Sequence, residues 1–351
     1  MRAIRGLRLA LALVAALALA IGAVACGDDE ESGSSGDSGS KPASEQDMSI
    51  TVGLPVHDAS YAPVYLAVDR GFFKEEGLDV KLVAFQSGSD LSKAVIGGSV
   101  EIANSAMSEM VLGINQRQPL KAFWGGMNML SFSWWAKPDI KTVKDAKGKK
   151  WGVTRVGSST DFLSRYLLTK HGMDPERDVT IVGVGPAAGA QAAMEANQIQ
   201  VATASQPSNF YYEDEGYVKI GDQAEFSKQY PTHVSYGREP WLKENPDAVK
   251  AYIRAVARGT KLAIDDPKAA METMAKYPKV PEKYLQRTYD YNKPGWAVDG
   301  ALPDKQSMDV FWDIGVQNEQ WPKPLEESQW LDRTWLDGFA EWGKDILESQ
   351  G

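Results

Sequence analysis

The sequence is poor in the residues that most catalytic and metal sites need. It contains one cysteine, Cys26, and three histidines, His57, His171 and His233, which are far apart in the chain. A single cysteine cannot form a disulfide within the chain, and isolated histidines without cysteine support do not indicate a zinc site. The sequence also lacks an H-E-x-x-H, a G-x-S-x-G and a Walker loop. We therefore expect no enzyme activity, no metal and no cofactor.

Basic runs are also missing. The formal charge is −9 at pH 7, and no stretch gathers lysine and arginine. Nucleic-acid-binding proteins carry a basic patch that neutralises phosphates, so this composition excludes that class of partner.

The first 25 residues have the composition of a secretory signal. Arg2, Arg5 and Arg8 give a positive start, an apolar run covers residues 9–24, and small residues precede Cys26. No other stretch approaches the roughly 20 apolar residues that a membrane span needs. We expect the mature protein to lie outside the cytoplasm and to be soluble.

Cys26 directly follows that apolar run and resembles the lipidated cysteine of bacterial lipoproteins. Ala23 stands where such signals usually have leucine, so plain secretory cleavage is the alternative. Residues 26–47 are mainly glycine, serine and acidic residues, which is typical of a disordered tether. A lipid followed by a tether would hold the folded part at the cell membrane.

Short apolar strands alternate with amphipathic helices from residue 49 to about 204, which indicates an α/β fold with mainly parallel sheets. The expected strands are 50–54, 79–84, 102–104, 121–125, 150–156, 179–184 and 201–204. The expected helices between them are 62–70, 90–97, 108–116, 160–171 and 187–197. Further helices are expected at 247–264, 267–276, 281–289, 304–319 and 331–347, as a layer covering the sheets.

Two segments about a hundred residues apart share a layout. Residues 91–106 and 190–205 each contain a helix of small residues, a polar turn and a strand of alternating valine or isoleucine. This repeat suggests two lobes of like build, although chance similarity between α/β units is an alternative.

The run YAPVYLAVDRGFFKEEGLDV at residues 61–80 carries a family resemblance. With VKDAKGKKWGV at 143–153, HGMDPERDV at 171–179, the unit at 187–207 and ENPDAVKAYIRA at 244–255, it resembles substrate-binding proteins of ABC importers of the nitrate, sulfonate and taurine type. That group includes binders of thiamine pyrimidine precursors. The sequence departs from the family pattern in two places. The family often has Gly-x-x-Asp before the inner strand of each lobe, but residues 98–101 end in Glu101, and residues 198–200 contain neither Gly nor Asp.

The resemblance implies a two-lobe periplasmic-binding-protein-like (type II) fold with two crossover segments and a helical C-terminal layer. Residues 48–135 with 236–351 would form lobe 1 and residues 136–235 lobe 2, with crossings near 134–138 and 231–237. It also implies a monomer that closes on a small molecule and delivers it to an ABC permease with its ATPase subunit. A sensory or scavenging binding protein without a transporter is an alternative.

Loops after the strands should meet at the ligand, because ligands of open parallel sheets sit beyond the carboxyl ends of the strands. The selected loops are 55–61, 104–107, 125–128, 157–161 and 205–209. The candidate ligand-binding residues are His57, Asp58, Ser60, Tyr61, Asn104, Ser105, Met127, Arg155, Ser158, Ser159, Thr160 and Gln206.

Each candidate also has a purely structural interpretation. Ser158 and Asp161 could simply cap a helix, and Arg155 could lie at a strand edge or form a salt bridge between the lobes. His57 with Asp58 could face solvent, and Asn104 with Ser105 could form a turn. Aromatic residues at 123–124, 132–135 and 210–212 could stack on a ring or pack in the core.

The hydroxyl groups at the start of the 160–171 helix favour a sulfonate or a similar small anion as the ligand. The alternatives are a thiamine pyrimidine precursor or another ring. An enzyme that forms such a pyrimidine is a further alternative, which export and the lack of placed histidine or cysteine groups oppose.

Overall fold

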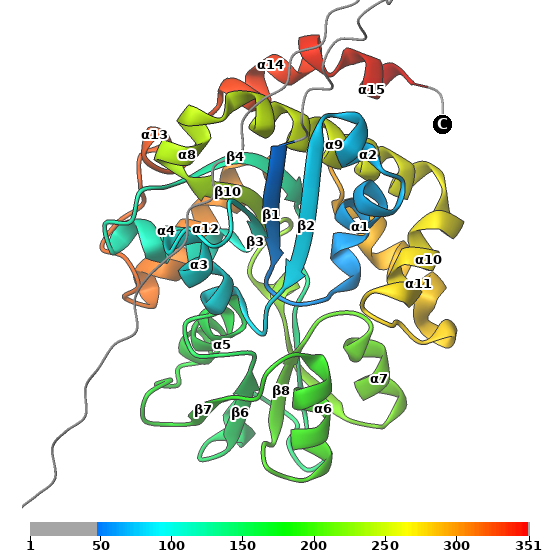
Figure 1. Ribbon diagram of the computed structural model, residues 1–351. Helices are drawn as coiled ribbons and strands as arrows, with labels where there is room; N and C mark the ends of the chain where they lie inside the picture. The colour runs from blue at the N-terminus through cyan, green and yellow to red at the C-terminus, as the bar shows by residue number, and fades with distance from the viewer. Residues whose placement is uncertain (1–47, 350–351) are drawn as a thin grey trace, which may run out of the picture. The chain divides into compact units, whose positions relative to one another are not determined.

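Two five-stranded sheets form the framework of the chain in a computed structural model that describes residues 48–349 (Figure 1). The predicted signal segment, Cys26 and the tether to residue 47 lie outside the described residues. Within residues 48–349, no helix is long and apolar enough to cross a membrane.

The two sheets have equivalent strand arrangements, except that the fourth strand in the order comes last along the chain in sheet 1 and first in sheet 2. Sheet 1 is ordered β2 (Leu78–Ala84), β1 (Met48–Leu54), β3 (Ile102–Ser105), β10 (His233–Arg238) and β4 (Leu120–Met127). Sheet 2 is ordered β7 (Thr180–Gly183), β6 (Lys150–Val153), β8 (Val201–Ala204), β5 (Ser133–Ala136) and β9 (Val218–Asp222). The strands β3 and β8, which end the two repeated segments, occupy the central position of their sheets. The repeat in the sequence therefore reflects two sheets of like build.

Each sheet is mainly parallel, as expected, with four strands that run in one direction and one strand that runs against them. In each sheet the first three strands are parallel, while β10 and β5 pair antiparallel with both of their neighbours. The predicted lobe boundaries at 135/136 and 235/236 fall inside β5 and β10, and the connections between the sheets precede both strands. The strands β5, β9 and β10 were not among those expected, and two of them, β5 and β10, directly follow a connection between the sheets.

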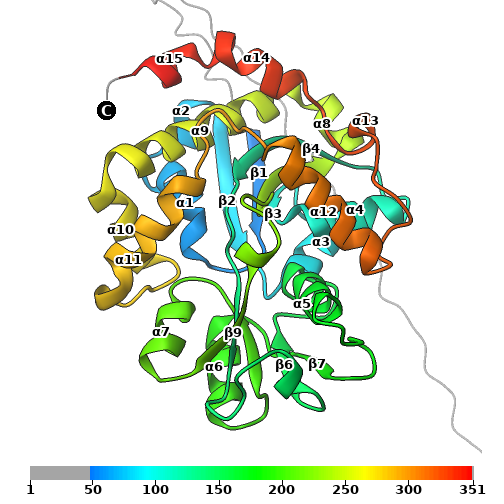
Figure 2. The ribbon, with the colours of Figure 1, turned by 180° about the vertical axis from the view of Figure 1, so that it is seen from behind.

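Helices surround both sheets, and those of the second half gather at sheet 1 (Figures 1 and 2). Beside sheet 2 lie α5 (Ser159–Lys170), α6 (Ala187–Glu195) and α7 (Ser208–Asp214). The helices between the strands of sheet 1 are α1 (Ala62–Asp69), α2 (Phe72–Glu75), α3 (Gly88–Ile96) and α4 (Met107–Asn115). The second half adds α8 (Glu239–Glu244), α9 (Pro246–Asp265), α10 (Pro267–Lys276), α11 (Glu282–Asn292), α12 (Lys305–Gln317), α13 (Glu327–Trp330), α14 (Thr334–Trp342) and α15 (Lys344–Glu348). Short 3₁₀ turns are η1 (Ala59–Tyr61), η2 (Lys144–Ala146), η3 (Gln223–Glu225) and η4 (Lys293–Gly295).

The C-terminal helices cover sheet 1 as expected, but the predicted helix 331–347 is divided. It breaks at Gly343, where a Cβ atom would lie 2.3 Å from the ring of Phe339. Arg254 of α9 joins α15 to the end of α2, because its guanidinium contacts Glu76 at 2.8 Å and Asp345 at 2.7 Å. The layer thus makes charged as well as apolar contacts.

The close approach of α9 to α1 gives a stability prediction. A Cβ atom on Gly259 would lie 2.1 Å from the backbone oxygen of Pro63. Gly259→Ala should therefore push the two helices apart and lower the free energy of unfolding by about 2 kcal/mol, the usual cost of overpacking. Urea unfolding measures this change, with Gly126→Ala as the control, since a Cβ atom there meets no atom within 4 Å. Equal stability of the two variants would contradict the prediction.

Candidate functional site

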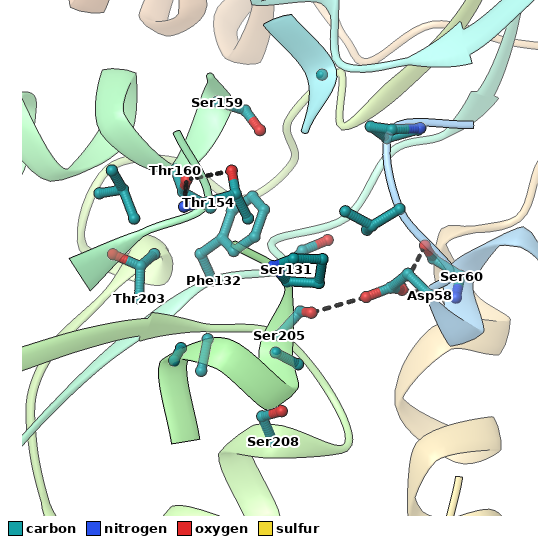
Figure 3. Close-up of a pocket in the computed structure, with 18 of the residues that line it drawn as sticks. Asp58, Ser60, Ser131, Phe132, Thr154, Ser159, Thr160, Thr203, Ser205 and Ser208 are labelled. Carbon is teal, nitrogen blue, oxygen red and sulfur yellow. Dashed lines mark hydrogen bonds between the residues drawn. The ribbon is translucent and has the colours of Figure 1, made fainter. Parts of the chain in front are cut away.

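A cavity lies between the two sheets, where loops from both converge (Figure 3). Its volume is about 100 Å³. The site is thus suited to a small organic molecule or ion.

The sheet 1 side of the cavity is the loop after β1. Asp58 is the N-cap of η1. Its Oδ1 accepts hydrogen bonds from the backbone N–H of Ser60 at 2.9 Å and from the Ser60 hydroxyl at 2.7 Å. Its other oxygen, Oδ2, accepts a hydrogen bond at 2.7 Å from the hydroxyl of Ser205, which follows β8 in sheet 2. Asp58 therefore connects the two sides of the cavity, and Figure 3 shows it facing Ser205.

Aromatic and imidazole rings line the same side. Tyr61 stacks on His233 with ring centroids 4.1 Å apart and planes 12° apart. Burial lowers the pKa of His233 to about 3, so this imidazole is neutral at physiological pH. The His57 ring lies 3.2 Å from the Tyr65 hydroxyl, and burial, followed by the charge of Lys279, lowers its pKa as well. The cavity thus presents neutral rings rather than imidazolium cations.

The sheet 2 side is the loop between β6 and α5. The Thr160 hydroxyl accepts a hydrogen bond from the Thr154 backbone N–H at 3.0 Å, and the two threonine hydroxyls lie 3.0 Å apart. The Ser158 hydroxyl donates to the Arg155 backbone oxygen at 2.7 Å and lies 2.8 Å from that of Thr160. These bonds hold the start of α5 against the cavity.

A carboxylate from the other side of the molecule occupies the start of α5. Ser158 precedes the helix but makes no side-chain cap, whereas the Ser159 backbone N–H donates at 2.8 Å to Oε1 of Glu109 on α4. Glu109 is 3% exposed, and its Oε2 has no hydrogen-bond partner. Burial raises the pKa of Glu109 to about 7, although the hydrogen bond from Ser159 acts in the opposite direction.

The two connections between the sheets complete the cavity. Ser131 and Phe132 lie on the first connection, and their backbone N–H groups donate to Oε1 of Gln223 on the second, at 2.8 and 3.1 Å. Thr232 and His233, at the end of the second connection, also line the cavity. The phenyl ring of Phe132 lies near the middle of the site in Figure 3.

The structure brings half of the sequence-predicted residues to the cavity. The predicted residues that line it are His57, Asp58, Ser60, Tyr61, Ser159 and Thr160. Arg155 instead forms an ion pair with Asp90 of α3 at 2.8 Å, which is the salt bridge considered as its alternative. Ser158 does not line the cavity; its hydroxyl accepts a hydrogen bond from the Thr154 hydroxyl at 2.9 Å and lies 2.8 Å from that of Thr160.

The other four predicted residues do not line the cavity. Asn104 and Ser105 are buried in β3, the central strand of sheet 1. The Asn104 amide donates a hydrogen bond to the Ser235 hydroxyl at 3.4 Å. Met127 is buried in an apolar cluster with Trp296. Gln206 is buried next to Ser205, one residue away from the cavity wall.

Several lining residues were not predicted. Pro55, Val56, Ala106, Ser205 and Ser208 fall within the selected loops, so the strand-end rule was sufficient to find their neighbourhood. Phe132 and Tyr212 belong to the aromatic clusters considered for stacking on a ring. The others lie outside both sets: Gly88, Ser131, Gly152, Val153, Thr154, Gly185, Pro186, Ala187, Ala190, Thr203, Ala204, Thr232 and His233.

The described residues that line the cavity include an acidic side chain but no basic one. Of the described residues that line it, Asp58 is the one with a charged side chain, and none is lysine or arginine. Nine lining residues are serine or threonine, and three are phenylalanine or tyrosine. The cavity therefore offers one negative charge, many hydroxyl groups and aromatic surface.

Comparison with known proteins places these features in a family. Residues 58–270 match the family model described as NMT1/THI5 like. The protein YtlA of Bacillus subtilis is 24% identical over 257 residues, which are 72% of this chain and 72% of YtlA. A 4-amino-5-hydroxymethyl-2-methylpyrimidine phosphate synthase of Aspergillus parasiticus is 24% identical over 232 residues, 60% of this chain and 65% of that protein.

A solved structure shares the fold. The periplasmic nitrate-binding protein NrtA of Synechocystis PCC 6803 superimposes with a TM-score of 0.67, at 17% identity, over 86% of this chain and 91% of that chain. The two-lobe periplasmic-binding-protein fold predicted from the sequence is confirmed.

Proposed function

The chain belongs to the NMT1/THI5-like family, and we propose that it is an extracytoplasmic solute-binding protein that captures a small molecule between its two sheets. Its fold and the placement of its cavity support this proposal. Lipidated Cys26 and the tether would hold it at the cell membrane, where it would deliver the ligand to an ABC permease with its ATPase subunit. Binding needs no reaction: closure occurs if the ligand binds the closed arrangement more tightly than the open one.

We propose a neutral or positively charged ligand with a flat ring or a compact ammonium group. The observation that carries this proposal is the charge of the lining, with Asp58 present and no lysine or arginine among its described members. A carboxylate attracts a cation or accepts hydrogen bonds from an amine, whereas it repels an anion. The tyrosine and phenylalanine rings add faces on which a ring or a cation can rest.

This ligand class differs from the small anion that the hydroxyl groups favour in the sequence. Hydroxyl groups bind neutral, cationic and anionic ligands alike, because each one both donates and accepts hydrogen bonds. The deciding group is therefore the charged one, Asp58. The cavity chemistry supports the ring ligand that was the alternative.

One of the relatives is a pyrimidine phosphate synthase, so catalysis is a second candidate function for this chain. We propose binding without chemistry, because the groups suited to proton transfer are already engaged. The Asp58 carboxylate accepts hydrogen bonds from Ser60 and Ser205, and His233 is stacked on Tyr61. Among the described residues, no three or more His, Cys, Asp or Glu side chains are placed to hold a metal ion.

A thermal-shift panel on residues 27–351 tests the ligand class. The panel contains a formylaminopyrimidine, choline, guanidinium, nitrate and methanesulfonate. Binding to the folded state adds stability by mass action, about 2.7 kcal/mol at a ligand concentration of 100 Kd. We expect a shift of several degrees with a ring or a cation and none with the two anions. A shift with nitrate or methanesulfonate alone would overturn the proposed ligand class.

Asp58→Asn should weaken binding of a cationic ligand by ten- to a hundredfold. The amide keeps the shape and one acceptor oxygen but removes the charge, and hydrogen bonds to charged groups are worth about 1.5–3 kcal/mol. Isothermal titration of the ligand found in the panel measures the change. Ser205→Ala is the control, since it removes the same bond across the cavity and leaves the carboxylate. If the Asp58→Asn variant bound the cation as tightly as the wild type does, Asp58 would not be the recognition group.

A further inference from the structure

Glu109 stands out because its buried carboxyl group meets the start of a helix at Ser159, which lines the cavity. Its Oε1 accepts the hydrogen bond from the Ser159 backbone N–H at 2.8 Å, and α5 continues for 12 residues from that point. The first N–H groups of a helix lack partners within the helix and carry a partial positive charge. In many proteins this is the position at which an anion binds.

The surroundings of Glu109 are shaped for its carboxylate. Gly88, which also lines the cavity, would bring a Cβ atom to 2.2 Å from Oε1, so a larger residue there would collide with the carboxylate. Among the described residues, Glu109 forms no salt bridge. Its Oε2 is buried and has no hydrogen-bond partner. Burying an unpaired carboxyl group costs free energy of folding, so its presence here indicates a role other than stabilising the fold.

Glu109 also bridges the two sides of the cavity. It belongs to α4, which packs on sheet 1, whereas Ser159 begins α5 beside sheet 2. The bond between them therefore forms only when the two sides are as close as they are in this structure. A ligand that needed the same N–H group would have to displace a carboxylate of the protein.

We propose that Glu109 determines the charge specificity of the site: its carboxyl group fills the start of α5 and keeps small anionic ligands out of the cavity. This inference rests on the proposed function and extends it by naming the residue that rejects the wrong ligands. An oxyanion would meet a like charge at the helix start as well as at Asp58. A neutral ring or a cation would keep the Glu109 to Ser159 bond intact.

The test is a gain of anion binding when the carboxylate is removed. Nitrate and methanesulfonate are titrated by calorimetry at pH 8 into the wild type, Glu109→Gln and Glu109→Ala. We expect at least a tenfold increase in methanesulfonate affinity for Glu109→Ala. A smaller increase is expected for Glu109→Gln, because the amide oxygen still accepts the bond from Ser159.

Glu101→Gln is the matched control. Glu101 lies in the same half of the molecule, and its Oε2 accepts a hydrogen bond from the Thr51 backbone N–H at 2.7 Å. Thr51 does not line the cavity, whereas Ser159, the partner of Glu109, does. The same loss of one negative charge there should leave anion affinity unchanged. An equal gain in this control would overturn the inference, as would a folded Glu109→Ala protein with no gain.

The same titrations with the formylaminopyrimidine and choline separate the two proposals. If the wild type binds neither of these, but Glu109→Ala gains anion affinity, the ligand class is wrong and the role of Glu109 stands. If the wild type binds one of them and Glu109→Ala gains nothing, the role of Glu109 is wrong and the ligand class stands. Circular dichroism and the melting temperature verify that each variant is folded.

Discussion

His233→Gln should remove a contribution that lowers the stability of the wild type as the pH falls below 6.5. Burial lowers the pKa of His233 from 6.5 to about 3. Above pH 6.5 the imidazole is neutral in both the folded and the unfolded chain, and its contribution to stability is fully present. As the pH falls from 6.5 towards 3, the unfolded chain takes up a proton that the folded chain cannot, so stability falls. The shift corresponds to roughly 5 kcal/mol over this window.

Urea unfolding from pH 4 to pH 8 measures this effect. The slope of the unfolding free energy against pH is the quantity to compare, because glutamine also loses the stacking on Tyr61 and lowers stability at every pH. His171→Gln is the control, since His171 follows α5 at the surface, where its ring contacts Glu225 at 3.3 Å. Identical slopes for the wild type and His233→Gln would show that His233 does not cause the acid sensitivity.

Glu109→Gln should increase stability above neutral pH. Burial raises the pKa of Glu109 from 4.5 to about 7. Below pH 4.5 the carboxyl group is protonated in both states, and its contribution is fully present. As the pH rises from 4.5 through 7, the unfolded chain releases the proton first, so stability falls by roughly 3 kcal/mol. Glutamine stays neutral and removes this loss.

The charged or titratable groups that act on Glu109 do not offset this effect. Tyr61, Tyr230 and Tyr236 face it from three different segments, and each is neutral in this range because the pKa of each is raised. The same unfolding series, extended to pH 8.5, compares Glu109→Gln with Glu101→Gln. A wild-type stability that does not fall between pH 6.5 and 8.5 would contradict the prediction.

The two effects oppose each other between pH 4.5 and 6.5. In that window the His233 contribution rises with pH while the Glu109 contribution falls with pH, at a similar rate for each. The wild-type profile should therefore be nearly flat there, and each single variant should reveal the slope of the other residue.

The sequence was sufficient to predict the elements that depend on local patterns. The loop 55–61 and the start of α5 were found because small and polar residues follow apolar strands. β5 was missed because its residues, Ser133–Ala136, show no alternation of apolar and polar types, and all four are buried. Its place in sheet 2 depends on pairing with β8 and β9, which no local pattern reveals.

The part of the site that could not be predicted depends on tertiary contacts. Ser158 has the residue type of a helix cap, yet Glu109, 50 residues earlier than Ser159 in the chain, takes that role. In the sequence Glu109 is a single acid in a helix of mixed composition, which usually indicates a solvent-exposed position. Only the approach of α4 to α5 makes it a buried group at the cavity.

The bonds between Gln223 and the first connection have a mechanical consequence. Because Gln223 accepts hydrogen bonds from both Ser131 and Phe132, the two segments that join the sheets are fastened to each other. Bending one segment alone would stretch these hydrogen bonds, so the two segments should move together as one hinge. The closure proposed here would then have a single axis of rotation. Each time the lobes close about that axis, the cavity loops of the two lobes would return to the same positions relative to each other.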